Sequence, residues 1–93
     1  MSTFELIEKE IVGTLKFPHI EVLSDAESII ERNSELKRAL YLGNLEHSKI
    51  KIYFEDDVSL KMVETTVWGL TDKRLILKQG VVIPINRVHM ISI

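Results

Sequence analysis

The sequence predicts an α+β fold, with one or two N-terminal helices followed by a five-stranded, strongly bent antiparallel sheet. Up to about residue 44, apolar residues recur three or four positions apart, as on one face of a helix. From about residue 48 they alternate with polar residues, as in strands with one buried face. The 93 residues are enough for one modest core, so we expect a single domain over residues 1–93.

A first, short helix is predicted from apolar residues at helical spacing: Phe4, Ile7 and Ile11. Ser2 and Glu5 have the spacing of a capping box, in which each side chain bonds a free backbone N–H. Gly13 is suited to end this helix.

A second helix is predicted to begin after Ser24, which forms another capping-box pattern with Glu27. Gly43 is the expected stop. The apolar stripe of this helix is interrupted by one asparagine and comprises Ala26, Ile29, Ile30, Asn33, Leu36 and Leu40. Residues off the stripe are expected to contact water, namely Glu31, Arg32, Glu35 and Arg38.

The first strand is predicted in "SKIKIYF", where Ile50, Ile52 and Phe54 share one face. After a turn at Glu55–Asp57, a long strand is predicted from about Ser59 to Leu70. Its apolar positions change from one face to the other, which indicates a bend or bulge, with Gly69 as the candidate kink.

The remaining strands are short. They are predicted at Arg74–Lys78 and Val81–Ile85, joined by a tight turn at Gln79-Gly80, with Pro84 at a sheet edge or strand end. One helical turn is expected at Ile85–Val88, and a last strand at Val88–Ile93.

Three segments carry this pattern: "KIKIYFEDD", "TTVWGLTDKRLILKQG" and "VVIPINRVHMISI". Together they resemble the small β-barrel shared by SH3-like and Sm-like proteins, over about residues 48–93. The resemblance implies a five-stranded small barrel, with the helix at Ser24–Leu42 capping it. A shared fold is weak evidence of a shared function.

The sequence departs from the functional motifs of both groups. Where Sm-like RNA-binding proteins have an Asp-x-Asn type of base pocket, this chain reads Thr71-Asp72-Lys73-Arg74, without asparagine. Near the fourth and fifth strands it offers Asn86 and Arg87 in place of the usual motif. The aromatics of the barrel segment are too few for an SH3 peptide groove: Tyr53, Phe54 and Trp68.

A second resemblance competes with the first. The strings "WGLTDKRLILKQG" and "IPINRV" are similar to the hairpin of bacterial pleckstrin-homology-like (PH-like) domains, in which several strands usually follow the hairpin. That resemblance implies phosphoinositide or membrane-surface binding.

Composition excludes several chemistries. The absence of cysteine rules out disulfides, thiolate catalysis and zinc bound by cysteine. The three histidines are scattered and no catalytic triad, phosphate-binding glycine loop or metal motif is visible, so we expect no enzyme, cofactor or metal site. A net charge of −2 disfavours broad nucleic-acid binding. The acidic N-terminal residues and the lack of a long apolar run predict a cytoplasmic protein.

Five residues are candidates for binding a ligand or partner: Trp68, Lys73, Arg74, Asn86 and Arg87. Lys73 and Arg74 are suited to phosphate, whereas Asn86 and Arg87 offer directional hydrogen bonds to a base or carboxylate. The alternative is structural: a solvated turn at residues 71–74, a second turn at Asn86 and Arg87, and a tryptophan that packs in the core.

The function we expect is a non-enzymatic interaction module. It would bind a protein partner, or form a homo-oligomer, through the strand edges at Val81–Ile85 and Val88–Ile93. A regulatory RNA- or DNA-binding small barrel is the alternative, with contacts from Lys49, Lys51, Lys73, Arg74, Lys78 and Arg87. A PH-like binder of membrane surfaces is a further alternative, and no small-molecule substrate is evident.

Overall fold

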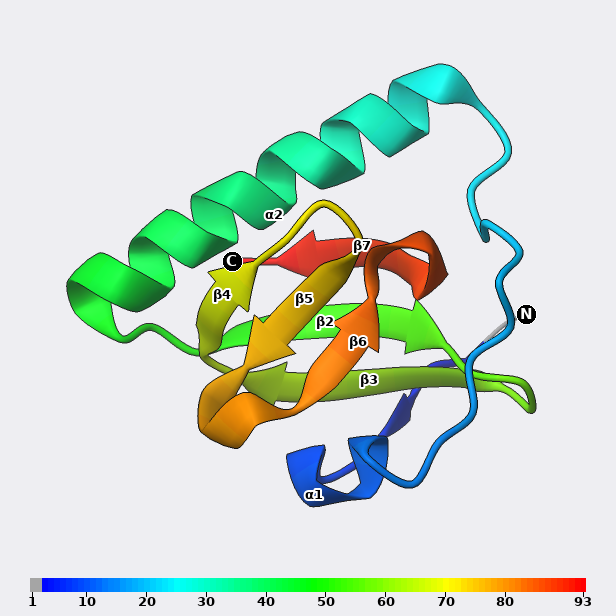
Figure 1. Ribbon diagram of the computed structural model, residues 1–93, viewed down its shortest axis with the longest axis horizontal. Helices are drawn as coiled ribbons and strands as arrows, with labels where there is room; N and C mark the ends of the chain where they lie inside the picture. Colours follow the sequence, from blue (N-terminus) through cyan, green and yellow to red (C-terminus); the bar gives the residue numbers. More distant parts are fainter. Residues whose placement is uncertain (1–2) are drawn as a thin grey trace.

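The computed structural model describes residues 3–93 of the chain (Figure 1). Its elements are, in order, β1 (Glu5–Leu6), α1 (Lys9–Val12), α2 (Ala26–Glu46), β2 (Ile50–Glu55), β3 (Leu60–Thr65), β4 (Val67–Leu70), β5 (Arg74–Leu77), the 3-10 turn η1 (Lys78–Gly80), β6 (Val82–Pro84), the 3-10 turn η2 (Ile85–Arg87) and β7 (Val88–Ser92). The prediction of an α+β fold with a long helix before the strands is confirmed.

The strands form two open sheets. One has the order β1-β3-β2-β7 and contains a parallel pair, β1 with β3; the other is antiparallel, with the order β4-β5-β6. Within residues 3–93, β6 pairs only with β5 and β7 pairs only with β2, so the sheets do not close into the five-stranded barrel that was expected. Figure 1 shows α2 beside β4 and β7, and α1 on the opposite side, beside β3.

The core lies between the two sheets and under α2. The predicted alternation of β2 is confirmed, since Ile50, Ile52 and Phe54 are all buried. They pack with buried residues of the other strands and of α2, including Leu36, Ala39, Val63, Leu75, Leu77, Ile83 and Val88. Removal of this apolar surface from water is the main favourable term in folding.

The long strand predicted at Ser59–Leu70 is two strands in two different sheets, β3 and β4, with the break at Thr66. A further irregularity lies between Val67 and Gly69 in the pairing with β5, where Gly69 was the predicted kink. The predicted change of buried face is wrong, because odd-numbered residues are buried on both sides of the break: in β4, Val67 is buried and Trp68 is exposed. In β3 the buried residues are the odd-numbered ones, Lys61, Val63 and Thr65.

The first predicted helix is wrong in type over its first half. Glu5 and Leu6 pair with the edge of β3, and only the four residues of α1 are helical. Formation of the first turn of a short helix is unfavourable, whereas the edge of β3 offers unpaired backbone N–H and C=O groups. Strand pairing is therefore the more stable arrangement for these residues. Phe4 then packs against Tyr53, with ring centroids 5.1 Å apart. The predicted cap at Ser2 lies outside the described residues.

The second helix is confirmed, but its ends and its buried face differ from the prediction. Asp25 is the N-cap in place of Ser24, and its carboxylate accepts the Ser28 N–H at 3.0 Å. The helix continues past Gly43 and ends at His47, which adopts the left-handed conformation at φ 54°. Its buried residues are Arg32, Leu36, Ala39 and Gly43, whereas Ile30 is exposed and Asn33 faces water.

The turns and short strands predicted for the C-terminal half are present, although β5, β6 and β7 are each one or two residues shorter than predicted. Residues 71–74 form a turn, and Pro84 ends β6 at a sheet edge. Gln79 and Gly80 make the hairpin turn, both with positive φ. The helical turn before β7 is η2.

Candidate functional site: two edge strands and two grooves beside the long helix

The segment between α1 and α2, residues 13–25, is called the connector. It carries no helix or strand and runs along one side of the molecule to the start of α2 (Figure 1). Its backbone is nevertheless held in place: Asp57 N–H donates to the Lys16 carbonyl oxygen at 2.9 Å, and Val22 N–H to that of Asn86 at 3.0 Å. The Asn86 side chain donates to the His19 carbonyl oxygen at 2.8 Å. These hydrogen bonds hold the connector against the β2–β3 turn and η2.

Arg87 is buried, and its guanidinium binds three backbone carbonyl oxygens of the same chain. It donates to Glu55 at 3.0 Å, to Ile20 at 2.7 Å and to Asp56 at 3.2 Å. A planar group with donors in a rigid fork is well suited to such a junction. These contacts join η2, the connector and the end of β2, so two of the five candidate residues, Asn86 and Arg87, have structural contacts that account for them.

Arg32 was expected to contact water but is buried in the middle of α2. It donates to both carboxylate oxygens of Glu21, at 2.6 and 2.8 Å, and to the Val88 carbonyl oxygen at 3.1 Å. The signal was present in the sequence, because Arg32 lies four residues before Leu36 and seven before Ala39, on one helical face. The predicted stripe contained apolar residues and one asparagine, so the charged Arg32 was not assigned to the buried face.

The burial of Glu21 opposes its ionisation and raises its pKa. Hydrogen bonds from Arg32 and from the Leu23 N–H act in the other direction and prevail, so the pKa of Glu21 lies below its usual value. The carboxylate is therefore ionised at neutral pH and forms an ion pair with Arg32.

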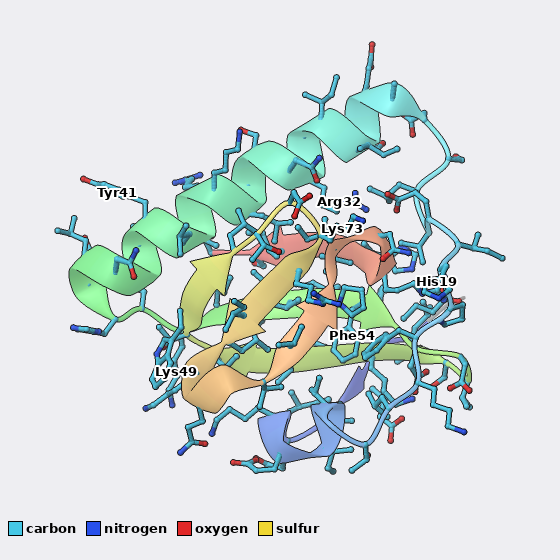
Figure 2. The ribbon with its side chains drawn as sticks, viewed as in Figure 1. His19, Arg32, Tyr41, Lys49, Phe54 and Lys73 are labelled. Atoms are coloured by element: carbon cyan, nitrogen blue, oxygen red, sulfur yellow. The ribbon has the colours of Figure 1, made fainter. Side chains whose placement is uncertain are left out.

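A groove of about 680 Å³ lies between the connector, α2, the β4–β5 turn and η2; we call it the connector groove. It brings together three of the five candidate residues: Lys73, Arg74 and Asn86. Figure 2 shows Lys73 on the turn beneath α2, near Arg32, and His19 on the connector.

The turn that carries Lys73 and Arg74 is closed by its own threonine. Thr71 Oγ1 accepts the N–H groups of Lys73 and Arg74 at 3.2 and 2.9 Å, so the turn is ordered without a ligand. Both basic side chains are exposed, and among residues 3–93 neither makes an ion pair. Their charges remain available.

Trp68 is a predicted binding residue for which core or half-buried packing was the alternative, and the residue is 52% exposed, so it is not part of the core. It lies on the outer face of the sheet β4-β5-β6, and no helix covers that face in Figure 1. Because Leu75, Leu77 and Ile83 point inward, Ile76 and Val82 share this outer face. The exposed cations Arg74 and Lys78 stand at the two ends of β5.

A second groove, of about 380 Å³, follows β7 beside α2; we call it the β7 groove. Its β7 side includes Met90, which is 53% exposed, and its α2 side includes the acids Glu31 and Glu35. The groove along β7 is therefore bordered by apolar and acidic side chains, while Arg32 of α2 binds the Val88 carbonyl oxygen at the start of the strand.

Asp56 and Lys61 form a buried pair at the turn between β2 and β3, 2.9 Å apart. Burial raises the pKa of Asp56, but hydrogen bonds from the Ser59 N–H, Lys61 and the Val58 N–H lower it further than burial raises it. The partners of its carboxylate lie in this turn and at the start of β3, so the predicted turn at Glu55–Asp57 is confirmed and the pair is structural.

Within residues 3–93, no three histidine or acidic side chains gather as a metal site requires, and no helix is long and apolar enough to cross a membrane. Over the same residues, the two open sheets have four edge strands, β1, β7, β4 and β6, to which the two grooves and the open face of β4-β5-β6 are added. Comparison of this chain with protein-family models, with curated proteins and with solved structures found no match.

Proposed function

We propose that this protein is a non-enzymatic interaction module that associates with a second copy of itself through the edges of β6 and β7. The observation that carries the proposal is that each of these strands pairs on one side only within the described chain. An edge strand presents unpaired N–H and C=O groups, which a strand from another chain can bind.

The charges beside the two edges are complementary. The β7 edge is bordered by Glu31 and Glu35 of α2, and Glu35 has only a weak contact, 4.0 Å, with Arg38. Next to β6, the paired strand β5 begins at Arg74, which lies opposite Pro84, and is followed by Lys78; both cations are exposed. Opposite charges favour a head-to-tail contact in which β6 of one copy meets β7 of the next.

The connection of the strands also supports the finer fold proposal, an SH3-like or Sm-like small barrel that is left open. One long segment, β3 and β4, contributes to both sheets, and β7 returns to pair with β2. Head-to-tail pairing of β6 and β7 would give both edges a partner.

Light scattering of the full chain at increasing concentration tests the proposal. We expect the average mass to rise above that of one chain. Two charge-reversal variants, E31K/E35K and R74E/K78E, should each associate less, because each places like charges at the contact. Mixed in equal amounts, they should associate again, with the two variants alternating, since each contact between unlike variants joins opposite charges.

A matched control is K49E/K51E, which changes the charge by the same amount on exposed residues that line neither the connector groove nor the β7 groove. It should associate like the wild type. A wild-type protein that remains strictly monomeric at high concentration would rule out self-association, and equal association of all variants would rule out these edges.

A second candidate function is binding of single-stranded nucleic acid on the outer face of β4-β5-β6. It is favoured by the exposure of Trp68 between two cations, Arg74 and Lys78. Bases stack on exposed aromatic rings, while cations bind the phosphates. Since Trp68 is the only tryptophan, oligonucleotide stacking should quench the protein's fluorescence, and added salt should reverse it. Unchanged fluorescence at low salt rejects this candidate.

A further inference from the structure

The connector groove holds basic side chains that the fold itself does not use. Lys73 and Arg74 make no ion pair within residues 3–93. Their turn is closed by hydrogen bonds from their backbone N–H groups to Thr71 Oγ1. The third cation of the groove, Arg32, is already bound to Glu21. Two free cations on adjacent residues therefore border one side of the groove.

Asn33 supplies an oriented donor on the opposite side. Its Oδ1 accepts a hydrogen bond from Arg32 Nε at 3.2 Å, which leaves its Nδ2 amide without a partner among the described residues. Asn33 lines the connector groove from α2. This explains the residue that interrupts the predicted apolar stripe: it lies at the mouth of a groove instead of in the core.

Between these polar groups the groove has apolar walls. They come from the connector, α2 and the end of β6, and comprise Phe17, Pro18, Ile29, Pro84 and Ile85. The volume of about 680 Å³ falls in the range of small-molecule sites, which combine apolar walls with a few placed polar groups.

The charge of the groove differs in sign from that of the whole chain. Three cations, Arg32, Lys73 and Arg74, face two carboxylates, Glu21 and Asp72, which gives a local charge of +1 with His19 neutral. The chain as a whole carries −2. A positive groove with adjacent lysine and arginine complements a phosphate group, which accepts several charged hydrogen bonds.

We propose that the connector groove binds a small organic phosphate, that is, a phosphate group joined to a flat or apolar body. The phosphate lies between Lys73, Arg74 and the Asn33 amide, and the body lies along Phe17, Pro18 and Ile85. This site shares Arg74 and Pro84 with the surroundings of β6, but it requires no second copy of the chain.

The walls of the groove are already in place without a ligand. Arg32 joins α2 to the connector through Glu21, and Asn86 joins η2 to the connector through the His19 carbonyl oxygen. A preformed site loses less conformational freedom when its ligand binds.

The test is a nuclear magnetic resonance titration of the full ¹⁵N-labelled chain with three probes: inorganic phosphate, adenosine and adenosine monophosphate. We expect adenosine monophosphate to bind most tightly and to shift the Asn33 side-chain amide and the backbone amides of residues 73, 74 and 85. Inorganic phosphate should shift the first three of these signals at higher concentration.

Two variants locate the site. K73A/R74A removes both free cations and should weaken adenosine monophosphate binding at least about tenfold, because charged hydrogen bonds are the strong ones. Asn33→Asp keeps the oxygen that binds Arg32 but replaces the free donor with a negative charge, so it should also weaken binding. The control K49A/K51A removes the same charge from exposed residues outside the groove and should bind like the wild type.

Each remaining outcome overturns the proposal. It fails if adenosine monophosphate shifts no groove signal, or if K73A/R74A binds it as well as K49A/K51A does. Equal affinities for inorganic phosphate and adenosine monophosphate would show that the apolar walls do not contribute to binding, which would contradict the proposal of an organic phosphate. Shifts centred on Trp68 would place the binding on the open sheet face instead. The titration is read at concentrations where light scattering shows one oligomeric state, so the result does not depend on self-association.

Discussion

Arg32 of α2 donates two hydrogen bonds to the carboxylate of Glu21, at 2.6 and 2.8 Å. A third hydrogen bond, at 3.1 Å, reaches the Val88 carbonyl oxygen at the start of β7. Because Glu21 belongs to the connector, one side chain joins three segments that are distant in sequence. Arg32 also lines both the connector groove and the β7 groove, so it is the wall that the two candidate surfaces share.

Replacement of Arg32 by lysine should destabilise the fold although the charge is kept. A lysine cannot bind both oxygens of Glu21 and the Val88 carbonyl oxygen, so we expect a loss of about 1–3 kcal/mol in the free energy of unfolding. Urea denaturation measures it. The matched control is R38K, on an exposed face of the same helix, which should stay within about 0.5 kcal/mol of the wild type. Equal midpoints for R32K and R38K would contradict the junction role of Arg32.

Stability should depend on acid through Asp56 and Glu21. Their pKa values in the folded protein lie below the usual 3.8 and 4.5. A lowered pKa contributes stability that is complete above the unfolded-state value and is lost as the pH falls through the folded-state value. We therefore expect the free energy of unfolding to be nearly constant above about pH 5.5 and to decline steadily at lower pH.

The variant D56N tests the part of this dependence that Asp56 contributes. It should lose about 2–4 kcal/mol at neutral pH, because Lys61 stays buried without its charged partner. It should also show a shallower decline in acid than the wild type, since one of the two carboxylates no longer titrates. A parallel decline for D56N and wild type would show that Asp56 does not have a lowered pKa.

Much of the β half follows from local sequence because its signals are local. The alternation of Ile50, Ile52 and Phe54 identifies the buried face, and Gln79 with Gly80 supplies the positive φ that the hairpin turn needs. In contrast, the pairing of Glu5 and Leu6 with β3 joins residues more than fifty positions apart. A pattern among neighbouring residues cannot predict a contact between segments so far apart in the sequence.

The candidate site was predicted only in part, because some of its residues have local signals and others depend on contacts between distant segments. Lys73 and Arg74 stand out because they are charged residues on a recognisable turn, and the groove includes them. The roles of Asn86 and Arg87 depend on where the connector passes, and residue type alone does not reveal that path. Arg32 and Asn33 were misassigned together, because the buried face of α2 contains a charged residue whose partner lies in another segment.

Arg87 should be as sensitive as Arg32, because its guanidinium binds three carbonyl oxygens in a buried position. R87K leaves at least one of these oxygens without a donor, which we expect to destabilise the fold by about 1–3 kcal/mol. If the side chain orders the connector, hydrogen exchange in R87K should speed up at the Val22 amide, which bonds to Asn86. Uniform changes across the chain would instead indicate only a global loss of stability.

Gly43 was predicted to end α2, yet it lies inside the helix against the backbone of Val67 in β4. A side-chain carbon at this position would collide with the Val67 carbonyl oxygen, which cannot move as a flexible side chain does. Gly43→Ala should therefore destabilise the protein by about 1–3 kcal/mol through overpacking, although alanine is the better helix former. The control is Gly13→Ala, since open space surrounds Gly13. A more stable G43A would mean that α2 can move away from β4.

The residue that does end α2 is His47, at φ 54° and ψ 33°. Left-handed backbone at this position crowds any side chain, whereas glycine adopts it freely. We expect His47→Gly to raise the free energy of unfolding by about 0.5–1 kcal/mol, since relief of this strain exceeds the added freedom of the unfolded chain. Thermal or urea unfolding at neutral pH measures the change. His47→Ala is the matched variant: it removes the same ring but keeps the crowded carbon, so it should show no gain. Equal stability of the two variants would mean that the imidazole, and not the backbone, determines the effect of this position.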